Sequence, residues 1–298
     1  MMKKVVFTGS AVAIVTPFHE TGVDYDRLGE LIEFQISNQT DGIVICGTTG
    51  ESSTMPDEEH LAAIEYTVKK VNGRIPVIAG TGSNDTEHGI KLCQAAERVG
   101  VDALLLVTPY YNKCTQKGLI AHYKALAGSV NLPVILYNVP SRTGVTIKPE
   151  TALELSKVEN IVAIKEASGS LTETLKIARL CGENLHIYSG NDDIIVPMLA
   201  AGAKGVISVV ANILPKDTHR ICELYQTGKT EEALQLQLKM LDLINALFVE
   251  VNPIPVKTAL NLMGFDVGKL RLPLCDMEEK NLEMLKTQMK NYGITIKE

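Results

Sequence analysis

The stretch NIVAIKEASG, residues 160–169, decides the fold, because it combines a buried-strand pattern with an ending that such strands rarely have. Residues 161–164 are apolar in succession, as expected for a parallel strand buried on both faces. The strand then ends on Lys165, although lysine is almost never fully buried without a partner. An ammonium group at the end of an apolar strand needs a structural or a chemical explanation.

Seven similar apolar runs occur elsewhere in the chain, and helical patterns separate them. The eight runs are AVAIV (11–15), GIVIC (42–46), PVIAG (76–80), ALLLV (103–107), PVILY (133–137), IVAIK (161–165), HIYSG (186–190) and GVISVV (205–210). Between the first two runs, DYDRLGELIEFQISN begins with Asp24, a typical helix N-cap. Eight strand–helix units predict an α/β fold, a closed (β/α)8 TIM barrel. An open doubly wound sheet is the alternative, but it usually has fewer strands, and no nucleotide fingerprint follows the first run.

The strand pattern stops after about residue 226, and three amphipathic helical patterns follow. They are KTEEALQLQLKMLDLINALFVEV, PVKTALNLMG and MEEKNLEMLKTQMKN. We therefore expect a catalytic barrel over residues 1–228 and a C-terminal helical extension over residues 229–298. The extension has more apolar positions than one edge of a barrel needs, so we expect some of them to face a partner chain.

The composition indicates a globular protein with a large core. Of the 298 residues, 45% are hydrophobic and 21% are charged, and the formal net charge is −6. No basic run indicates nucleic acid as a partner, and no apolar run reaches the roughly 18 residues of a membrane span. The six cysteines form no Cys-x-x-Cys pair, which favours free buried thiols in a reducing compartment. We expect a cytoplasmic protein.

The lysine can be interpreted in two ways. Side chains alternate between the inside and the outside of a barrel, so an inward Lys165 implies inward Ala163 and Ile161 and an outward Glu166. Lys165 then lies at the carboxyl end of its strand, where barrel enzymes place their chemistry. One interpretation is a structural lysine whose amine reaches solvent. The other is a Schiff-base nucleophile, since an apolar barrel mouth favours the neutral amine that attacks a carbonyl.

The second run leads into CGTTGES, residues 46–52. Gly47 and Gly50 permit a tight turn whose N–H groups can face a carboxylate, and Thr48 and Thr49 add two hydroxyls. The alternative is a turn that caps the next helix, and both interpretations can hold. The turn is not a P-loop, because no Gly-Lys-Ser/Thr follows.

Polar groups also follow other runs. Tyr137 ends the fifth run, beside the lysine of the next strand, and its hydroxyl either has a structural partner or transfers protons. Arg142, on the following loop, forms either a surface salt bridge or a bidentate clamp for a substrate carboxylate. Tyr110 and Tyr111 follow the fourth run, and Gly190 ends the seventh, where it permits close approach.

The sequence indicates no metal site. The histidines show no ligand spacing, and no His-Glu-x-x-His motif occurs. A lysine aldolase needs no metal, because the iminium accepts the electrons. We expect neither a metal nor a cofactor.

Several stretches together resemble the dihydrodipicolinate synthase family of class I aldolases, which includes N-acetylneuraminate lyase. They cover essentially the whole chain, in order: GTTGES, AGTGSN, TPYYN, YNVPSRTG, IKEASG, GVISV and NPIPVK. The resemblance implies that pyruvate forms a Schiff base with Lys165 and that its enamine attacks L-aspartate-4-semialdehyde. The product is then 4-hydroxy-tetrahydrodipicolinate, in the first committed step towards lysine and diaminopimelate.

The resemblance also implies residue roles. Thr48, Tyr137 and Tyr111 correspond to the family's proton relay, in which Tyr111 crosses a tight-dimer interface to the partner's site. Thr49, with its backbone N–H, corresponds to the group that holds the pyruvate carboxylate. The family is usually a homotetramer, a dimer of tight dimers.

The residues for the second substrate follow in the same way. Arg142 corresponds to the family's ligand for the semialdehyde carboxylate, and Gly190 and Ile207 correspond to residues that line the site. The sialic acid lyases usually have Ser-Thr in place of Thr48 and Thr49, and they lack the arginine. Both markers favour the synthase, although an aldolase acting on a sugar acid remains an alternative. A non-catalytic protein that kept the barrel is a third possibility.

The family's lysine-inhibitor pocket has a counterpart with two replacements. Its positions here are Ser52, Ser53, Asp57, His60, Asn84, His88 and Tyr110. Asp57 and His88 replace a histidine and a glutamate of the inhibited members. Because His88 offers no fixed negative charge to the inhibitor's amine, we expect weak or absent feedback by lysine.

Overall fold

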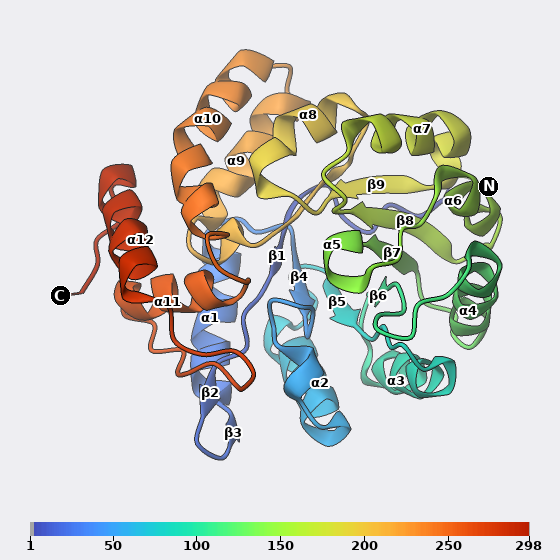
Figure 1. The fold of residues 1–298 in the computed structure, drawn as a ribbon, viewed down its shortest axis with the longest axis horizontal. Coiled ribbons are helices and arrows are strands. Elements are labelled where there is room, and N and C mark those ends of the chain that lie inside the picture. Colours follow the sequence, from blue (N-terminus) through green and yellow to red (C-terminus); the bar gives the residue numbers. More distant parts are fainter. Residues whose placement is uncertain (1–2, 298) are drawn as a thin grey trace.

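Eight parallel strands close into a barrel in the computed structural model, which describes residues 3–297 (Figure 1). Residues 1, 2 and 298, at the outer ends of the two predicted domains, lie outside the described residues. The barrel strands are β1 (Gly9–Ala13), β4 (Gly42–Ile45), β5 (Val77–Gly80), β6 (Ala103–Val107), β7 (Val134–Asn138), β8 (Ile161–Glu166), β9 (His186–Ser189) and β10 (Gly205–Ser208). β1 closes the ring by pairing with both β10 and β4. The predicted barrel is confirmed.

Helices surround the barrel and connect its strands (Figure 1). They are α1 (Tyr25–Ser37), α2 (Asp57–Val71), α3 (Thr86–Val99), α4 (Gln116–Gly128), α6 (Pro149–Ser156), α7 (Leu171–Cys181), α8 (Ile195–Ala200) and α9 (Pro215–Gln226), and a single turn, α5 (Pro140–Thr143), follows β7. Asp24 caps α1 as predicted, since its carboxylate accepts a hydrogen bond from the amide of Arg27 at 3.0 Å. A small antiparallel hairpin, β2 (Phe18–His19) and β3 (Gly22–Val23), precedes α1.

Two apolar clusters form the core. The outer one lies between strands and helices and includes Ile164 and Leu136. The inner one fills the barrel with mostly small or branched side chains, among them Ala11, Ala163 and Ile207. This inner cluster gives the carboxyl end of the barrel an apolar floor.

Three helices follow the barrel at one side (Figure 1). They are α10 (Thr230–Ala246), α11 (Ile254–Met263) and α12 (Glu279–Tyr292), and α12 packs against the other two. The predicted first helix extends to residue 251, but α10 ends at Ala246. Residues 247–253 instead form a connection that ends in Asn252-Pro253, where proline disfavours helical geometry for the residue before it.

The cysteines form no disulfide in the part of the chain that the structure describes. Cys46, Cys93, Cys181 and Cys222 are buried, and burial raises the pKa of each thiol. Cys275, by contrast, is exposed. None of the helices within residues 3–297 has the length and apolar content needed to cross a bilayer. Over the same residues, no three His, Cys, Asp or Glu side chains gather as metal ligands would.

Candidate active site

Lys165 lies inside the carboxyl end of the barrel, on β8. Its side chain is only 6% exposed, so the interpretation of a lysine that reaches solvent is wrong. The strand register pairs Lys165 with Tyr137 on β7 and with Tyr188 on β9. The amine lies 4.4 Å from the centre of the Tyr137 ring, so the predicted proximity of these two side chains is correct.

The strand below the lysine departs from simple alternation. Ala163 belongs to the inner cluster as expected, but Ile161 packs in the outer cluster and Val162 takes the inward place. The register explains this, because Val134 pairs with Ile161 while the next residue of β7 pairs with Ala163. β8 therefore carries one extra residue at this point. As a result, the β8 side chains that precede it point to the opposite side of the barrel from the one that simple alternation predicts. The prediction that Ile161 points inward is wrong.

A cavity of about 190 Å³ opens above Lys165. Six residues predicted from the sequence line it: Thr48, Thr49, Tyr137, Arg142, Lys165 and Gly190. Gly190 fits for a steric reason. A Cβ at this position would come within 2.6 Å of the Ala167 Cβ and 3.1 Å of the Lys165 Cε, so only glycine leaves the lysine its place.

The turn after β4 positions the two threonines. Cys46 and Glu51 adopt left-handed backbone conformations, with φ of 54° and 55°, and the turn lies between them. Thr49 is buried, and its Oγ1 accepts a hydrogen bond from the Asn252 Nδ2 at 2.9 Å. Thr48 lines both this cavity and a neighbouring one.

Arg142 lies on α5 at the edge of the cavity. Its Nη2 donates to the backbone carbonyl of Asn252 at 3.1 Å rather than to a carboxylate. The guanidinium therefore keeps donors for an anionic ligand, which a surface salt bridge would have engaged.

Two predicted residues do not line this cavity. Tyr111 is 92% exposed and has a positive φ of 69°, so its ring is largely in contact with solvent in the single chain. Ile207 is fully buried in the inner cluster, and Val209, two residues further along, lines the cavity instead.

The neighbouring cavity, of about 350 Å³, shares Thr48, Val139 and Arg142 with the first. Most of the predicted effector residues line it: Ser52, Ser53, Asp57, His60, His88 and Tyr110. Asn84 is adjacent, because its Nδ2 donates to the Tyr110 carbonyl at 3.1 Å. The Nε2 of His88 lies 3.0 Å from each carboxylate oxygen of Asp57, so the two residues that differ from those of the inhibited family members contact each other.

Sequence reasoning missed several residues that line the cavity. They are Phe248 and Asn252 from the connection after α10, Asn191 from the loop after β9, and Ala13, Val44, Leu105, Val139, Ser141, Ala167 and Val209. Asn252 had a signal, since it is a polar residue directly before a proline in an apolar segment, and such a residue is a poor choice for a helix or an apolar core.

Asp192 supports the site from behind. It is buried, and its Oδ2 accepts hydrogen bonds from the amides of Val209 and Val210, both at 2.9 Å. Burial raises the pKa of this carboxyl. Hydrogen bonds with Ser208 and these two amides, and the positive charge of Lys165, act in the opposite direction and lower the pKa. Asp192 thus fixes the loop that brings Val209 to the cavity.

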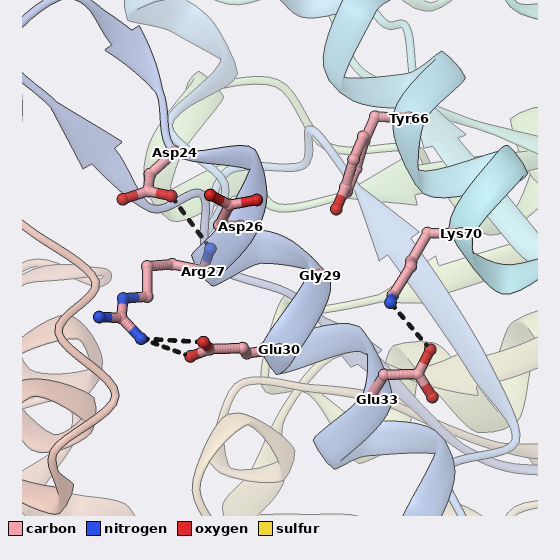
Figure 2. A pocket seen from close by; sticks show the side chains of 8 residues that line it. All are labelled: Asp24, Asp26, Arg27, Gly29, Glu30, Glu33, Tyr66 and Lys70. Carbon is pink, nitrogen blue, oxygen red and sulfur yellow. Dashed lines mark hydrogen bonds and ion pairs between the residues drawn. The ribbon is translucent and has the colours of Figure 1, made fainter.

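A larger hollow, of about 730 Å³, lies on the outside of the barrel between α1 and α2 (Figure 2). Its charged side chains already form ion pairs, as Figure 2 shows for Arg27 with Glu30 and for Lys70 with Glu33. Hydrogen bonds from Arg74 and Lys70 hold the pKa of Glu33 at about 2. Among the described residues, the one lysine amine that lines this hollow, that of Lys70, is thus paired with a carboxylate. The cavity at Lys165 is therefore the candidate reaction site.

Comparisons with known proteins agree with this geometry. Residues 6–292 match the model of the Dihydrodipicolinate synthetase family. A 4-hydroxy-tetrahydrodipicolinate synthase of Acetivibrio thermocellus is 60% identical over 293 residues, which cover 98% of this chain and 100% of the relative.

Two solved structures are also similar. The crystal structure of dihydrodipicolinate synthase from Aquifex aeolicus has a TM-score of 0.96 and 45% identity, and covers 98% of this chain and 100% of its own. A chloride-inhibited dihydrodipicolinate synthase from Acinetobacter baumannii, complexed with pyruvate, has a TM-score of 0.94 and 46% identity, and covers 96% of this chain and 99% of its own.

Proposed function

Because the chain belongs to the dihydrodipicolinate synthetase family, we infer that it condenses pyruvate with L-aspartate-4-semialdehyde. The product is 4-hydroxy-tetrahydrodipicolinate, and the reaction is the first step towards lysine and diaminopimelate. The observation that carries this inference is the buried Lys165 amine, which shares one small cavity with two threonines, a tyrosine and an arginine.

Lys165 is the nucleophile. Its neutral amine attacks the C2 carbonyl of pyruvate, and water leaves to give an iminium. Loss of a proton from the pyruvate methyl group then gives an enamine, whose carbon attacks the aldehyde and forms the new C–C bond. The amino group of the second substrate finally attacks C2, closes the ring and displaces the lysine. The apolar residues of the inner cluster lie beneath Lys165 and form the floor of the site.

Thr49 holds the pyruvate carboxylate through its hydroxyl and backbone N–H. Tyr137 is placed to move protons at C2, because its ring lies beside the Lys165 amine. Thr48 extends the relay from Tyr137, and Tyr111 of a neighbouring subunit completes it. The exposed, outward Tyr111 side chain supports this last assignment, since it is available to a second subunit.

Arg142 binds the carboxylate of the semialdehyde with donors that face the cavity. Gly190 leaves space beside the lysine for the reacting carbons, and Ile207 supports the floor of the site. The barrel, residues 1–228, therefore supplies the reacting groups, and residues 229–298 form an extension that closes one side of the cavity through Phe248 and Asn252.

The protein forms a homotetramer, a dimer of tight dimers in the cytoplasm. Exposed leucines support a second interface beside the one that Tyr111 crosses. They are Leu171 and Leu175 on α7 and Leu234 and Leu238 on α10, and both helices pack against α8. Such a group of apolar side chains on neighbouring helices is typical of a contact between subunits.

Feedback inhibition by lysine is weak or absent. In the second cavity the Asp57 carboxylate is engaged by His88, so it offers less to an incoming ammonium group. Steady-state rates measured with increasing lysine test this. Inhibition at low lysine concentration would contradict the proposal.

The decisive experiment combines trapping with an assay. Borohydride added with pyruvate should increase the mass of the wild-type chain at Lys165 and leave Lys165→Ala unchanged. A coupled assay should give product with L-aspartate-4-semialdehyde and none with N-acetylneuraminate or 2-keto-3-deoxygluconate. Trapping without semialdehyde turnover would indicate another aldolase, and failure of trapping would reject the Schiff base altogether.

A further inference from the structure

Asn252, contributed by the C-terminal extension, has an unusual set of partners. It is 5% exposed and lines the cavity at Lys165. Its Nδ2 donates to the Thr49 hydroxyl oxygen at 2.9 Å, and its backbone carbonyl accepts from Arg142 at 3.1 Å. Its Oδ1 is buried and has no hydrogen-bond partner within residues 3–297.

A buried acceptor without a partner is costly, so its presence in a ligand cavity needs an explanation. Pyruvate cannot satisfy Oδ1, because its carboxylate and ketone only accept hydrogen bonds. The second substrate differs, because its α-ammonium group carries three N–H donors. The chemistry of the two substrates therefore assigns Oδ1 to the second one.

The position of Asn252 agrees with this assignment. In an α-amino acid, the carboxylate and the ammonium are attached to the same carbon, so their protein partners must lie close together. Arg142, the carboxylate ligand of the proposed function, is bonded to the backbone of Asn252 itself. An acceptor for the neighbouring ammonium is thus expected on or beside this residue.

We propose that Asn252 binds the amino-acid end of the second substrate: Oδ1 accepts from the α-ammonium, while the backbone carbonyl orients Arg142 towards the adjacent carboxylate. The proposal rests on the proposed function and makes Asn252 a determinant of aldehyde specificity. It also gives Asn252 a positioning role for pyruvate. Because Nδ2 donates to the Thr49 oxygen, the Thr49 proton stays free to bond the pyruvate carboxylate.

Asn191 is the rival acceptor in this cavity, since its Oδ1 is also buried without a partner in the described chain. Its backbone bonds go to Ser189, and the structure shows no bond from Asn191 to Arg142 or Thr49 within residues 3–297. Asn191 is only half-buried, so solvent can reach the residue that carries this oxygen. These differences favour Asn252.

The test compares two aldehydes on the full-length enzyme. L-aspartate-4-semialdehyde is the substrate, and 4-oxobutanoate, the same aldehyde without the ammonium, is the competing inhibitor. Asn252→Ala should raise the KM for the semialdehyde about tenfold to a hundredfold, as expected for a lost charge-assisted hydrogen bond. The inhibition constant of 4-oxobutanoate should change by less than about threefold.

Two further substitutions separate the two roles. Asn252→Asp keeps an acceptor for the ammonium but loses the donor to Thr49. It should therefore retain the preference for the aminated aldehyde while the KM for pyruvate rises. Asn261→Ala is the matched control, because it removes two hydrogen bonds elsewhere in the extension and does not line the cavity. It should leave the ratio between the two aldehydes unchanged.

Several outcomes would overturn the proposal. Equal weakening of both aldehydes in Asn252→Ala would reduce the residue to a structural role. Loss of the preference in Asn191→Ala, with Asn252→Ala unaffected, would assign the ammonium to the other amide. Wild-type enzyme that gives no product with the semialdehyde would remove the proposed function and this inference together. If the wild-type enzyme turns over the semialdehyde and Asn252→Ala still prefers the aminated aldehyde, only the inference about Asn252 is refuted.

Discussion

Replacing Lys257 with methionine should destabilise the protein strongly, because Lys257 forms a buried ion pair. Its Nζ lies 2.8 Å from the Glu51 Oε1, and both side chains are 1% exposed. Lys257 also donates to the Lys269 carbonyl at 3.0 Å, and Glu51 accepts from the Arg271 amide at 3.0 Å. Methionine keeps most of the volume but leaves the Glu51 carboxylate buried with one amide donor. Removing one partner of such a pair costs about 3–5 kcal/mol.

The assay is urea unfolding followed by circular dichroism at one fixed protein concentration, because assembly contributes to apparent stability. Lys286→Met is the matched control. Lys286 pairs with Glu283 at 2.7 Å in the same extension, but both side chains are partly exposed, so its loss should cost less than about 1 kcal/mol. The double variant Lys257→Met with Glu51→Gln removes both buried charges and should recover most of the stability that the single variant loses.

Loss of the Lys257–Glu51 ion pair should affect substrate binding as well as stability. Glu51 is two residues from Thr49, so Lys257→Met should also raise the KM for pyruvate in the fraction that remains folded. The reasoning fails if Lys257→Met costs no more than Lys286→Met. It also fails if the double variant is as unstable as the single one, because then the unpaired charge is not the cause.

Three other predictions concern separate parts of the molecule. Tyr111→Phe should slow turnover by about a hundredfold, because it removes the relay hydroxyl. If Tyr111 serves the neighbouring subunit's site, mixed oligomers of Tyr111→Phe and Lys165→Ala subunits should recover part of the activity. Mixtures that stay inactive would contradict this role of Tyr111. The hydrogen bond to Asp41, at 2.8 Å, raises the pKa of His219, so this stabilisation is full below about pH 6.5 and is lost as pH rises through the folded-state pKa. His219→Gln should therefore destabilise the protein more at about pH 6 than at about pH 9, and an equal loss of unfolding free energy at both would refute the coupling. Leu175→Asp should convert the proposed tetramer to dimers in sedimentation analysis, whereas an unchanged sedimentation coefficient would place the second interface elsewhere.

The barrel was predictable because its signals are local. Each strand is a short apolar run, and parallel pairing then places all carboxyl ends together, which brings Tyr137 opposite Lys165 without any knowledge of distant contacts. The error at Ile161 has a different origin. Whether β8 carries an extra residue depends on how it pairs with β7, and nothing within residues 161–166 encodes that choice.

The limits for the site have the same cause. Gly190 could be predicted because it directly follows a strand, whereas Val209 lines the cavity on a loop whose amide the buried, sequence-distant Asp192 holds. Tyr111 shows a further limit, since its side chain is exposed in the single chain and the role proposed for it requires a second subunit. Sequence patterns describe one segment at a time, so they cannot show which segments meet.

The extension is the clearest case, and it changes how the site should be understood. Asn252 bonds Thr49, Lys257 pairs with Glu51, and Arg142 bonds the Asn252 carbonyl. Each contact joins the extension to a loop at a strand end, and two of them hold the loop that carries both threonines. The barrel alone therefore presents the reacting amine, but the geometry of both proposed carboxylate ligands, Thr49 and Arg142, depends on a segment more than 100 residues further along the chain. Substitutions in that segment should alter substrate binding before they alter the lysine chemistry.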